Sequence, residues 1–237
     1  IDCFEKGGLT SATIMPTMPA LDAAVAYARA NPRFSFGVHL TYVGDGIELP
    51  ILPPSEVPDL CDKNGKLMPS QLGRLKGLFR RTSIDQIAKE TEAQITRIRD
   101  LGVPISHVDS HGHMHKYHPY RQALKRVLPK FGITKVRSVQ DLYLQKPLKS
   151  PNFWLGPHWK RVLDRMFTTT DHLFLPRSAF DLDWTATLLK LPITGTIEFG
   201  LHPGTTEQWR IEEHRDAILL AQRAREQGHA LISWKEL

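Results

Sequence analysis

The chain has 237 residues, 41% of them hydrophobic and 24% charged, which fits one globular domain with a sizeable core. The net charge of +6 is spread along the chain, and its densest run, RLKGLFRRT at 74–82, is short and interrupted by Leu and Phe, so we expect no nucleic-acid partner. Two cysteines without a CxxC pair argue against a disulfide scaffold or a cysteine-rich zinc site. The sequence shows no membrane-length apolar run and no opening signal peptide, so we expect a cytoplasmic protein without an integral membrane segment.

The first half of the chain alternates short apolar runs with amphipathic stretches. We predict strands at 10–16 and 33–40, a helix at 20–32 and a long surface loop over the proline-rich residues 48–66. The helix predicted at 83–102 is the most clearly marked. Ser83 and Gln86 form a capping-box pattern at its start, and Gly102 suits its C-terminal stop.

The second half continues the alternation of strands and helices. We predict strands at 105–110, 134–139, 172–176, 195–202 and 229–234, and helices at 120–132, 159–167, 184–191 and 211–228. This order is typical of a parallel α/β fold, either a (β/α) barrel or an open doubly wound sheet. Because no glycine-rich phosphate loop follows any predicted strand, we favour an irregular (β/α) barrel that forms a single domain over 1–237.

Histidine occurs near the end of several predicted strands. GVHL closes strand 33–40, DSHGHMH follows strand 105–110, and GLHPG closes strand 195–202. The carboxyl ends of the strands of a barrel lie on one face, where barrel enzymes keep their active sites. We therefore expect these side chains to lie close together: His39, Asp109, His111, His113, His115 and His202.

Imidazole and carboxylate groups together suit Zn²⁺ or a similar divalent ion. We predict His39 and His111 as metal ligands, His202 as the acid that protonates a leaving group, and Asp109 as the group that orients a histidine. A third strong ligand and a general base are missing from this set. The alternative interpretation is that each histidine is a polar residue satisfied by its neighbours, or that HMHKYHP is a solvated loop in which His115 and His118 are partly structural.

Four segments carry a resemblance to a known family. GLTSATIM, FGVHL, HVDSHGHMH and EFGLHPG, in this order, resemble the YdjC-like (ChbG-type) carbohydrate deacetylases, and the resemblance covers nearly the whole chain. ILPPSEVPDLCDKNGK is most similar to the branch associated with hopanoid biosynthesis. The family implies an irregular (β/α) barrel of the NodB/YdjC-like kind, with a divalent metal (Zn or Mg) that serves the hydrolysis of an N-acetyl group on an amino sugar.

The resemblance also implies roles for individual residues. The metal-binding histidines correspond to His39 and His111, and the histidine of LHPG, here His202, serves as acid or transition-state stabiliser. The family has in addition an Asp-Asp-Phe-Gly motif on its first strand, with one aspartate as metal ligand and the other as proposed base. This sequence begins too late to contain that strand, and we expect the motif in residues that precede Ile1.

The leading hypothesis is a metal-dependent hydrolase that removes acetyl from an N-acetylated amino sugar or a glycolipid, with a homodimer as the expected assembly. His113, His115 and Arg137 are predicted to contact the substrate, and Tyr117 and Trp209 to stack on a sugar; simple packing, or an ion pair for Arg137, is the alternative. A second hypothesis is an inactive carbohydrate-binding protein on the same scaffold. A third is another barrel metalloenzyme, such as a sugar isomerase or a phosphoesterase.

Overall fold

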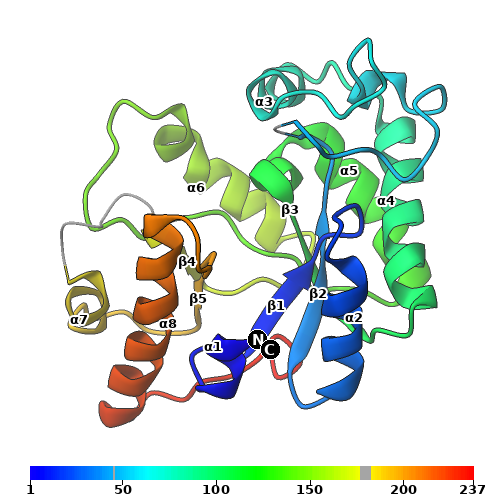
Figure 1. Cartoon of the computed structure of the whole chain (residues 1–237). Coiled ribbons are helices and arrows are strands. Elements are labelled where there is room, and N and C mark those ends of the chain that lie inside the picture. Colours follow the sequence, from blue (N-terminus) through cyan, green and yellow to red (C-terminus); the bar gives the residue numbers. More distant parts are fainter. Residues whose placement is uncertain (45, 177–182) are drawn as a thin grey trace. The chain divides into compact units, whose positions relative to one another are not determined.

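The computed structural model describes residues 1–44, 46–176 and 183–237 and has an α/β fold (Figure 1). The strands are β1 (Ser11–Ile14), β2 (Ser35–Leu40), β3 (Ile105–Ser110), β4 (His172–Phe174) and β5 (Ile197–Phe199). The α-helices are α1 (Asp2–Glu5), α2 (Leu21–Ala30), α3 (Ser70–Leu78), α4 (Ile84–Asp100), α5 (His118–Val127), α6 (Pro151–Asp164), α7 (Trp184–Leu189) and α8 (Gln208–Glu226). Segments of 3-10 helix are η1 (Pro58–Leu60), η2 (His111–Lys116) and η3 (Leu128–Phe131).

The chain forms two compact units. The first unit comprises Ile1–Ser11, Ser138–Arg161 and Thr169–Leu237, and the second unit comprises Ala12–Arg137 and Val162–Thr168. Each unit has its own sheet and its own buried side chains. The single domain over 1–237 stays a prediction.

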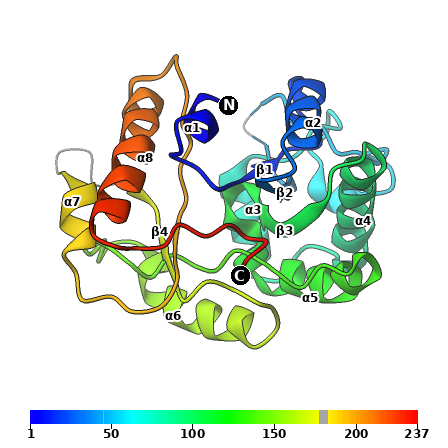
Figure 2. The same ribbon diagram turned by 90° about the horizontal axis from the view of Figure 1, so that it is seen from below.

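The second unit is built on a sheet in the order β1-β2-β3, in which β2 and β3 run parallel. Val38, Leu40 and Val108 of this sheet are fully buried. Helices α4 and α5 lie side by side, as Figures 1 and 2 both show, and α4 also contacts β2. Helix α4 buries three isoleucines on its inner face, as expected of a helix packed on a core, together with the polar Glu90, Thr91 and Gln94.

The start of α4 explains why its sequence forms a helix there. The Ser83 hydroxyl accepts a hydrogen bond from the Gln86 backbone N–H at 3.4 Å, as the capping-box pattern predicts. The reciprocal bond is made differently: the Ser83 N–H donates to the Asp59 carboxylate, and the Gln86 side chain accepts from the Asp59 N–H. The N-terminus of α4 is thereby joined to the proline-rich loop.

An irregularity in the parallel pairing sets which residues of β2 and β3 face each other. Phe36 pairs with Ile105, but two residues later Val38 pairs with Val108, so β3 has one more residue than β2 in this interval. A Cβ atom at Gly37 would lie 2.5 Å from the His107 carbonyl oxygen, so glycine is required for this close approach. The shift places His39 opposite Asp109.

The first unit has a parallel pair of strands, β4 and β5. Phe174, Trp184, Leu188 and Leu220 form its buried cluster, and the Trp184 indole N–H donates to Asp216 at 2.8 Å. Helix α8 contacts both α1 and α7, in agreement with the two views in Figures 1 and 2. Among the described residues, every helix is too short or too polar to cross a lipid bilayer.

The predicted parallel α/β class is confirmed, whereas several predicted boundaries are wrong. Residues 229–234 form no strand, because the Trp234 N–H donates to the Ser11 hydroxyl and the Ser233 N–H to the Glu236 carboxylate instead of to a neighbouring strand. Residues 134–139 form only isolated parallel bridges, at Lys135 and Val136. Strand 195–202 is shortened to β5, helix 159–167 is the end of the longer α6, and α3 was not predicted.

Candidate active site

His39 and Asp109 form the centre of the candidate site in the second unit. The register of β2 and β3 makes them neighbours, and His39 Nδ1 lies 2.7 Å from Asp109 Oδ1. The Asp109 side chain is fully buried, while 17% of the His39 side chain is exposed. The Thr13 hydroxyl of β1 lies 3.4 Å from the same nitrogen.

Arg137 completes this arrangement from the other side of Asp109. Its backbone N–H donates to the Val108 carbonyl at 3.0 Å, and its guanidinium forms an ion pair with Asp109 Oδ2. Burial by itself would raise the pKa of the Asp109 carboxyl, but the charge of Arg137 and the hydrogen bond with His39 outweigh it and hold that pKa well below its usual range. Asp109 is therefore an ionised carboxylate that accepts from the His39 Nδ1–H, which leaves the His39 Nε2 lone pair for a ligand.

His111 follows β3 directly and begins η2. Its ring centroid lies 5.8 Å from that of His39, with an angle of 71° between the rings. Gly112 and His113 after it have positive φ angles of 63° and 54°, which turn the chain sharply. A non-glycine residue in this conformation is strained, and such strain is found more often at functional sites than elsewhere. The Arg74 Nε–H of α3 donates to the Gly112 carbonyl at 3.3 Å and ties this turn to α3.

His115 is buried, whereas His113 is partly exposed. His115 is fully buried, and the Ser110 hydroxyl lies 2.7 Å from its Nδ1 and accepts from its backbone N–H at 2.9 Å. His113 stacks edge-on against His115 with centroids 6.0 Å apart, and burial lowers its pKa well below the usual value. The substrate contacts predicted for His113 and His115 stay predictions.

Tyr117 and His107 are both buried. Tyr117 is 5% exposed and lies against Gly77 of α3, so its predicted role as a sugar-stacking residue is not supported by its burial. His107 is 1% exposed and its Nδ1 lies 2.8 Å from the Ser106 hydroxyl. Burial lowers the pKa of His107 to about 3, so this ring is neutral at physiological pH. His118 begins α5, two residues before the predicted start of this helix.

His202 belongs to the first unit and follows β5 by three residues rather than ending it. The Glu213 carboxylate of α8 accepts from the His202 backbone N–H and lies 3.4 Å from His202 Nδ1. Glu213 is buried, whereas 46% of the His202 side chain is exposed. Trp209 lies edge-on to His202 with ring centroids 5.9 Å apart, and the Arg210 guanidinium covers the Trp209 ring.

The donor set of the second unit provides part of a metal site. His39 and His111 supply neighbouring imidazoles, and the carboxylate behind His39 is the partner that metal-bound histidines usually have. Within the part of the chain that the structure describes, no group of three or more His, Cys, Asp or Glu side chains is placed to hold a metal ion. The residues present therefore fit two ligands of a site that usually has three protein ligands.

Sequence reasoning missed three residues at these positions: Thr13, Arg74 and Glu213. Glu213 had the clearest signal, because it lies four residues before Ala217 on the face of α8 that also buries Leu220 and Ala224. An acid at that position of an apolar stripe needs a polar partner. Thr13 and Arg74 had no such signal, since their contacts depend on how separate elements pack.

The chain thus has a parallel α/β fold with a carboxylate-backed histidine pair at the ends of two adjacent strands. The family model described as YdjC-like protein matches residues 1–234, and the chain belongs to this family.

Three relatives illustrate the similarity. A carbohydrate deacetylase of Halalkalibacterium halodurans is 34% identical over 136 residues, which cover 56% of this chain and 54% of that protein. A carbohydrate deacetylase of Geobacillus stearothermophilus is 33% identical over 117 residues, covering 49% of this chain and 43% of that protein. Carbohydrate deacetylase 1 of Listeria innocua is 28% identical over 155 residues, covering 65% of this chain and 59% of that protein. The chain thus spans about half the length of the curated relatives it matches.

A solved structure of similar fold is that of an Enterococcus faecalis protein named for cellobiose-phosphate cleavage. Its TM-score is 0.76 at 21% identity, and the match covers 99% of this chain and 90% of that chain. At this level of identity the similarity concerns the fold alone.

Proposed function

We propose that this protein removes acetyl groups from carbohydrates by metal-assisted hydrolysis. The observation that carries the proposal is the His39–Asp109–Arg137 chain with the His111 ring beside it. Relatives that bear the name carbohydrate deacetylase support the substrate class and the reaction. An N-acetylated amino sugar is the substrate we favour within that class, free or as part of a glycolipid.

His39 and His111 would hold a divalent ion, with Zn²⁺ more suitable than Mg²⁺ for imidazole ligands. Such an ion, when bound, polarises a carbonyl and lowers the pKa of water. Asp109 fixes the tautomer of His39 so that Nε2 presents its lone pair, and Arg137 keeps Asp109 ionised while it does so. Thr13 lies beside the same ring and limits its rotation.

His202 remains the predicted acid for the leaving amine. Glu213, bound to both the backbone and the ring of His202, is the residue that orients it. Closure of the strands into an irregular barrel and assembly into a homodimer are further parts of the proposal.

Carbohydrate binding without catalysis is the second candidate function. It is favoured by one observation: His39 and His111 could bind a metal ion, but the described residues contain no group of three possible metal ligands. The two candidates differ in whether acetate is formed.

Acetate release from N-acetylglucosamine oligomers distinguishes them. The experiment uses the full-length protein and compares wild type, His111→Ala and the control His229→Ala, which changes an exposed histidine after α8. We expect release by wild type and His229→Ala, its loss in the presence of a chelator with recovery on adding Zn²⁺, and at least about a hundredfold lower rate for His111→Ala. Full activity of His111→Ala would refute the metal assignment, and sugar binding without acetate release would favour the second candidate.

A further inference from the structure

Helix α3 carries its large apolar side chains on the outside. Those of Leu72, Leu75, Leu78 and the following Phe79 are between 43% and 62% exposed. The residues it buries are small, namely Ser70, Gly73 and Gly77. A surface helix normally has the opposite arrangement, with its apolar side chains turned to the core.

The buried glycines explain how α3 is held without its leucines. A Cβ atom at Gly73 would lie 2.2 Å from Val43, and one at Gly77 would lie 3.2 Å from both Tyr117 and Tyr120. The backbone of α3 therefore packs directly on the neighbouring elements, as glycine allows. The leucines are left about half exposed, at 43% to 53%.

The loop before α3 extends the exposed apolar surface. Ile47 and Leu49 are 66% and 51% exposed, and their segment is joined to the one that enters α3 by a hydrogen bond from the Leu67 N–H to the Glu48 carbonyl. Figure 1 shows this loop next to α3. We call the combined surface the α3 face; it consists of Ile47, Leu49, Leu72, Leu75, Leu78 and Phe79.

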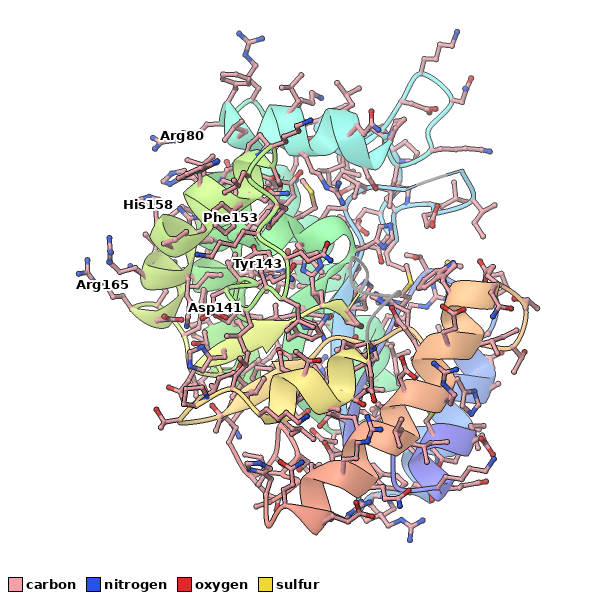
Figure 3. The ribbon with its side chains drawn as sticks, turned by 90° about the vertical axis from the view of Figure 1, so that its left-hand side faces the viewer. Arg80, Asp141, Tyr143, Phe153, His158 and Arg165 are labelled. Atoms are coloured by element: carbon pink, nitrogen blue, oxygen red, sulfur yellow. The ribbon has the colours of Figure 1, made fainter. Side chains whose placement is uncertain are left out.

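The segment that contains α3 is strongly basic, although Glu48 lies between two residues of the α3 face. Residues 63–84 contain six basic residues and no Asp or Glu: Lys63, Lys66, Arg74, Lys76, Arg80 and Arg81. Arg80 and Arg81 are exposed, and Figure 3 shows Arg80 extending outward from the end of α3. Apolar side chains surrounded by Lys and Arg are typical of segments that lie in the interface of an anionic membrane.

We propose that the α3 face docks the protein onto an anionic lipid surface. The apolar side chains enter the region between headgroups and acyl chains, and the surrounding cations bind lipid phosphates. A second copy of this chain fits less well, because a two-fold contact would bring the same positive charges together. The docking itself does not depend on the proposed function.

Docking would bring the lipid surface close to the candidate site. Arg74 belongs to α3, and its hydrogen bond to Gly112 joins α3 to the turn that follows His111. If the proposed function holds, an acetylated sugar on a lipid anchor is the substrate class that this arrangement favours. This last step rests on the proposed function, whereas the binding experiment below does not.

Co-sedimentation with vesicles tests the proposal without any activity measurement. The protein is mixed with vesicles of phosphatidylcholine alone or of equimolar phosphatidylcholine and phosphatidylglycerol. We expect binding to the anionic vesicles, weakened at high salt, and at least about tenfold weaker binding for Leu75→Ser with Phe79→Ser. Arg80→Gln with Arg81→Gln should weaken binding by about fivefold for each charge removed.

Leu231→Ser with Ile232→Ser is the matched control. These apolar residues are also exposed, at 36% and 41%, but they belong to the first unit and have no cluster of Lys and Arg beside them in the sequence, so their substitution should leave vesicle binding unchanged. Circular dichroism verifies that each variant is folded. Equal binding of wild type and the Leu75/Phe79 variant, or no binding to anionic vesicles, would overturn the proposal. A dimer that this variant converts to monomer, with no vesicle binding, would assign the face to a second copy instead.

Discussion

Asp109 is a fully buried carboxylate whose two oxygens have different partners. Oδ1 lies 2.7 Å from His39 Nδ1, and Oδ2 is paired with Arg137. If His39 or Arg137 turned toward bulk water, its contact with Asp109 would break. Asp109 is thus the main partner that orients His39, on which the candidate site depends.

Replacing Asp109 by Asn keeps the volume of the side chain but removes its charge. Arg137, whose side chain is 15% exposed, would lose its counter-charge, so we expect Asp109→Asn to lower the free energy of unfolding by about 3–5 kcal/mol. Urea denaturation measures this value. Asp100→Asn is the control, because Asp100 is 61% exposed in its pair with Arg99 and should change stability by less than about 1 kcal/mol. Equal small effects of both substitutions would contradict the structural role of Asp109.

His107 predicts a pH dependence of stability. Its pKa is lowered by burial to about 3 in the folded protein, whereas an unfolded histidine titrates near its model value of 6.5. Between these values the unfolded state binds a proton that the folded state does not. The contribution of His107 is therefore fully favourable above pH 6.5 and is lost as the pH falls toward 3, by about 1.4 kcal/mol per pH unit.

The slope of unfolding free energy against pH measures this effect. We expect His107→Asn to reduce the slope between pH 6 and pH 4 by the amount that corresponds to about one proton bound on unfolding. Asparagine retains a group able to bond the Ser106 hydroxyl. A change in stability at neutral pH does not affect this comparison. The same slope in wild type and variant would show that His107 is not the neutral buried group described above.

At the scale of elements, the irregular pairing of β2 with β3 determines the site. Without it His39 would pair with Val108, since Phe36 pairs with Ile105. A shift of one residue in a strand turns its side chains to the opposite face. Gly37, whose position admits no Cβ atom beside His107, permits the observed register.

Gly37→Ala should therefore damage both stability and site. The added methyl would lie 2.5 Å from the His107 carbonyl oxygen, and we expect a loss of about 1–3 kcal/mol together with displacement of His39 from Asp109. Chemical denaturation and the NMR shift of the His39 Nδ1 proton report the two effects. Gly156→Ala in α6 is the control, because a Cβ there meets its nearest atom at 3.6 Å and should change stability by no more than about 1 kcal/mol. An unperturbed Gly37→Ala would mean that the register does not need glycine.

Local signals predicted individual elements well where they were strong. Helix α4 was found from its capping residues and apolar spacing, and strands β2 and β3 from their apolar runs. Helix α3 was missed because its pattern is inverted: glycines face inward and leucines outward. The strand expected at 229–234 was wrong because side chains of Ser11 and Glu236 take the hydrogen bonds of that segment.

At the scale of the whole molecule, the sequence predicted the parallel α/β class and the neighbourhood of His39, Asp109 and His111. It did so because carboxyl ends of adjacent parallel strands meet at one edge of a sheet. The partnership of Arg137 with Asp109 was not predictable, since it requires the chain after α5 to return beside Val108. The burial of His115 was likewise not predictable, because it follows from the turn at Gly112 and His113, and no local sequence pattern predicts that turn.

The zinc affinity of the protein, measured by competition with a chromophoric chelator, tests the central claim most directly. The account predicts about one Zn²⁺ per chain, about 10–100-fold weaker binding for Asp109→Asn, and a still larger loss for His39→Ala and His111→Ala. His229→Ala, which changes an exposed histidine after α8, should bind as wild type does. Equal zinc affinity of wild type, His39→Ala and His111→Ala would contradict the account.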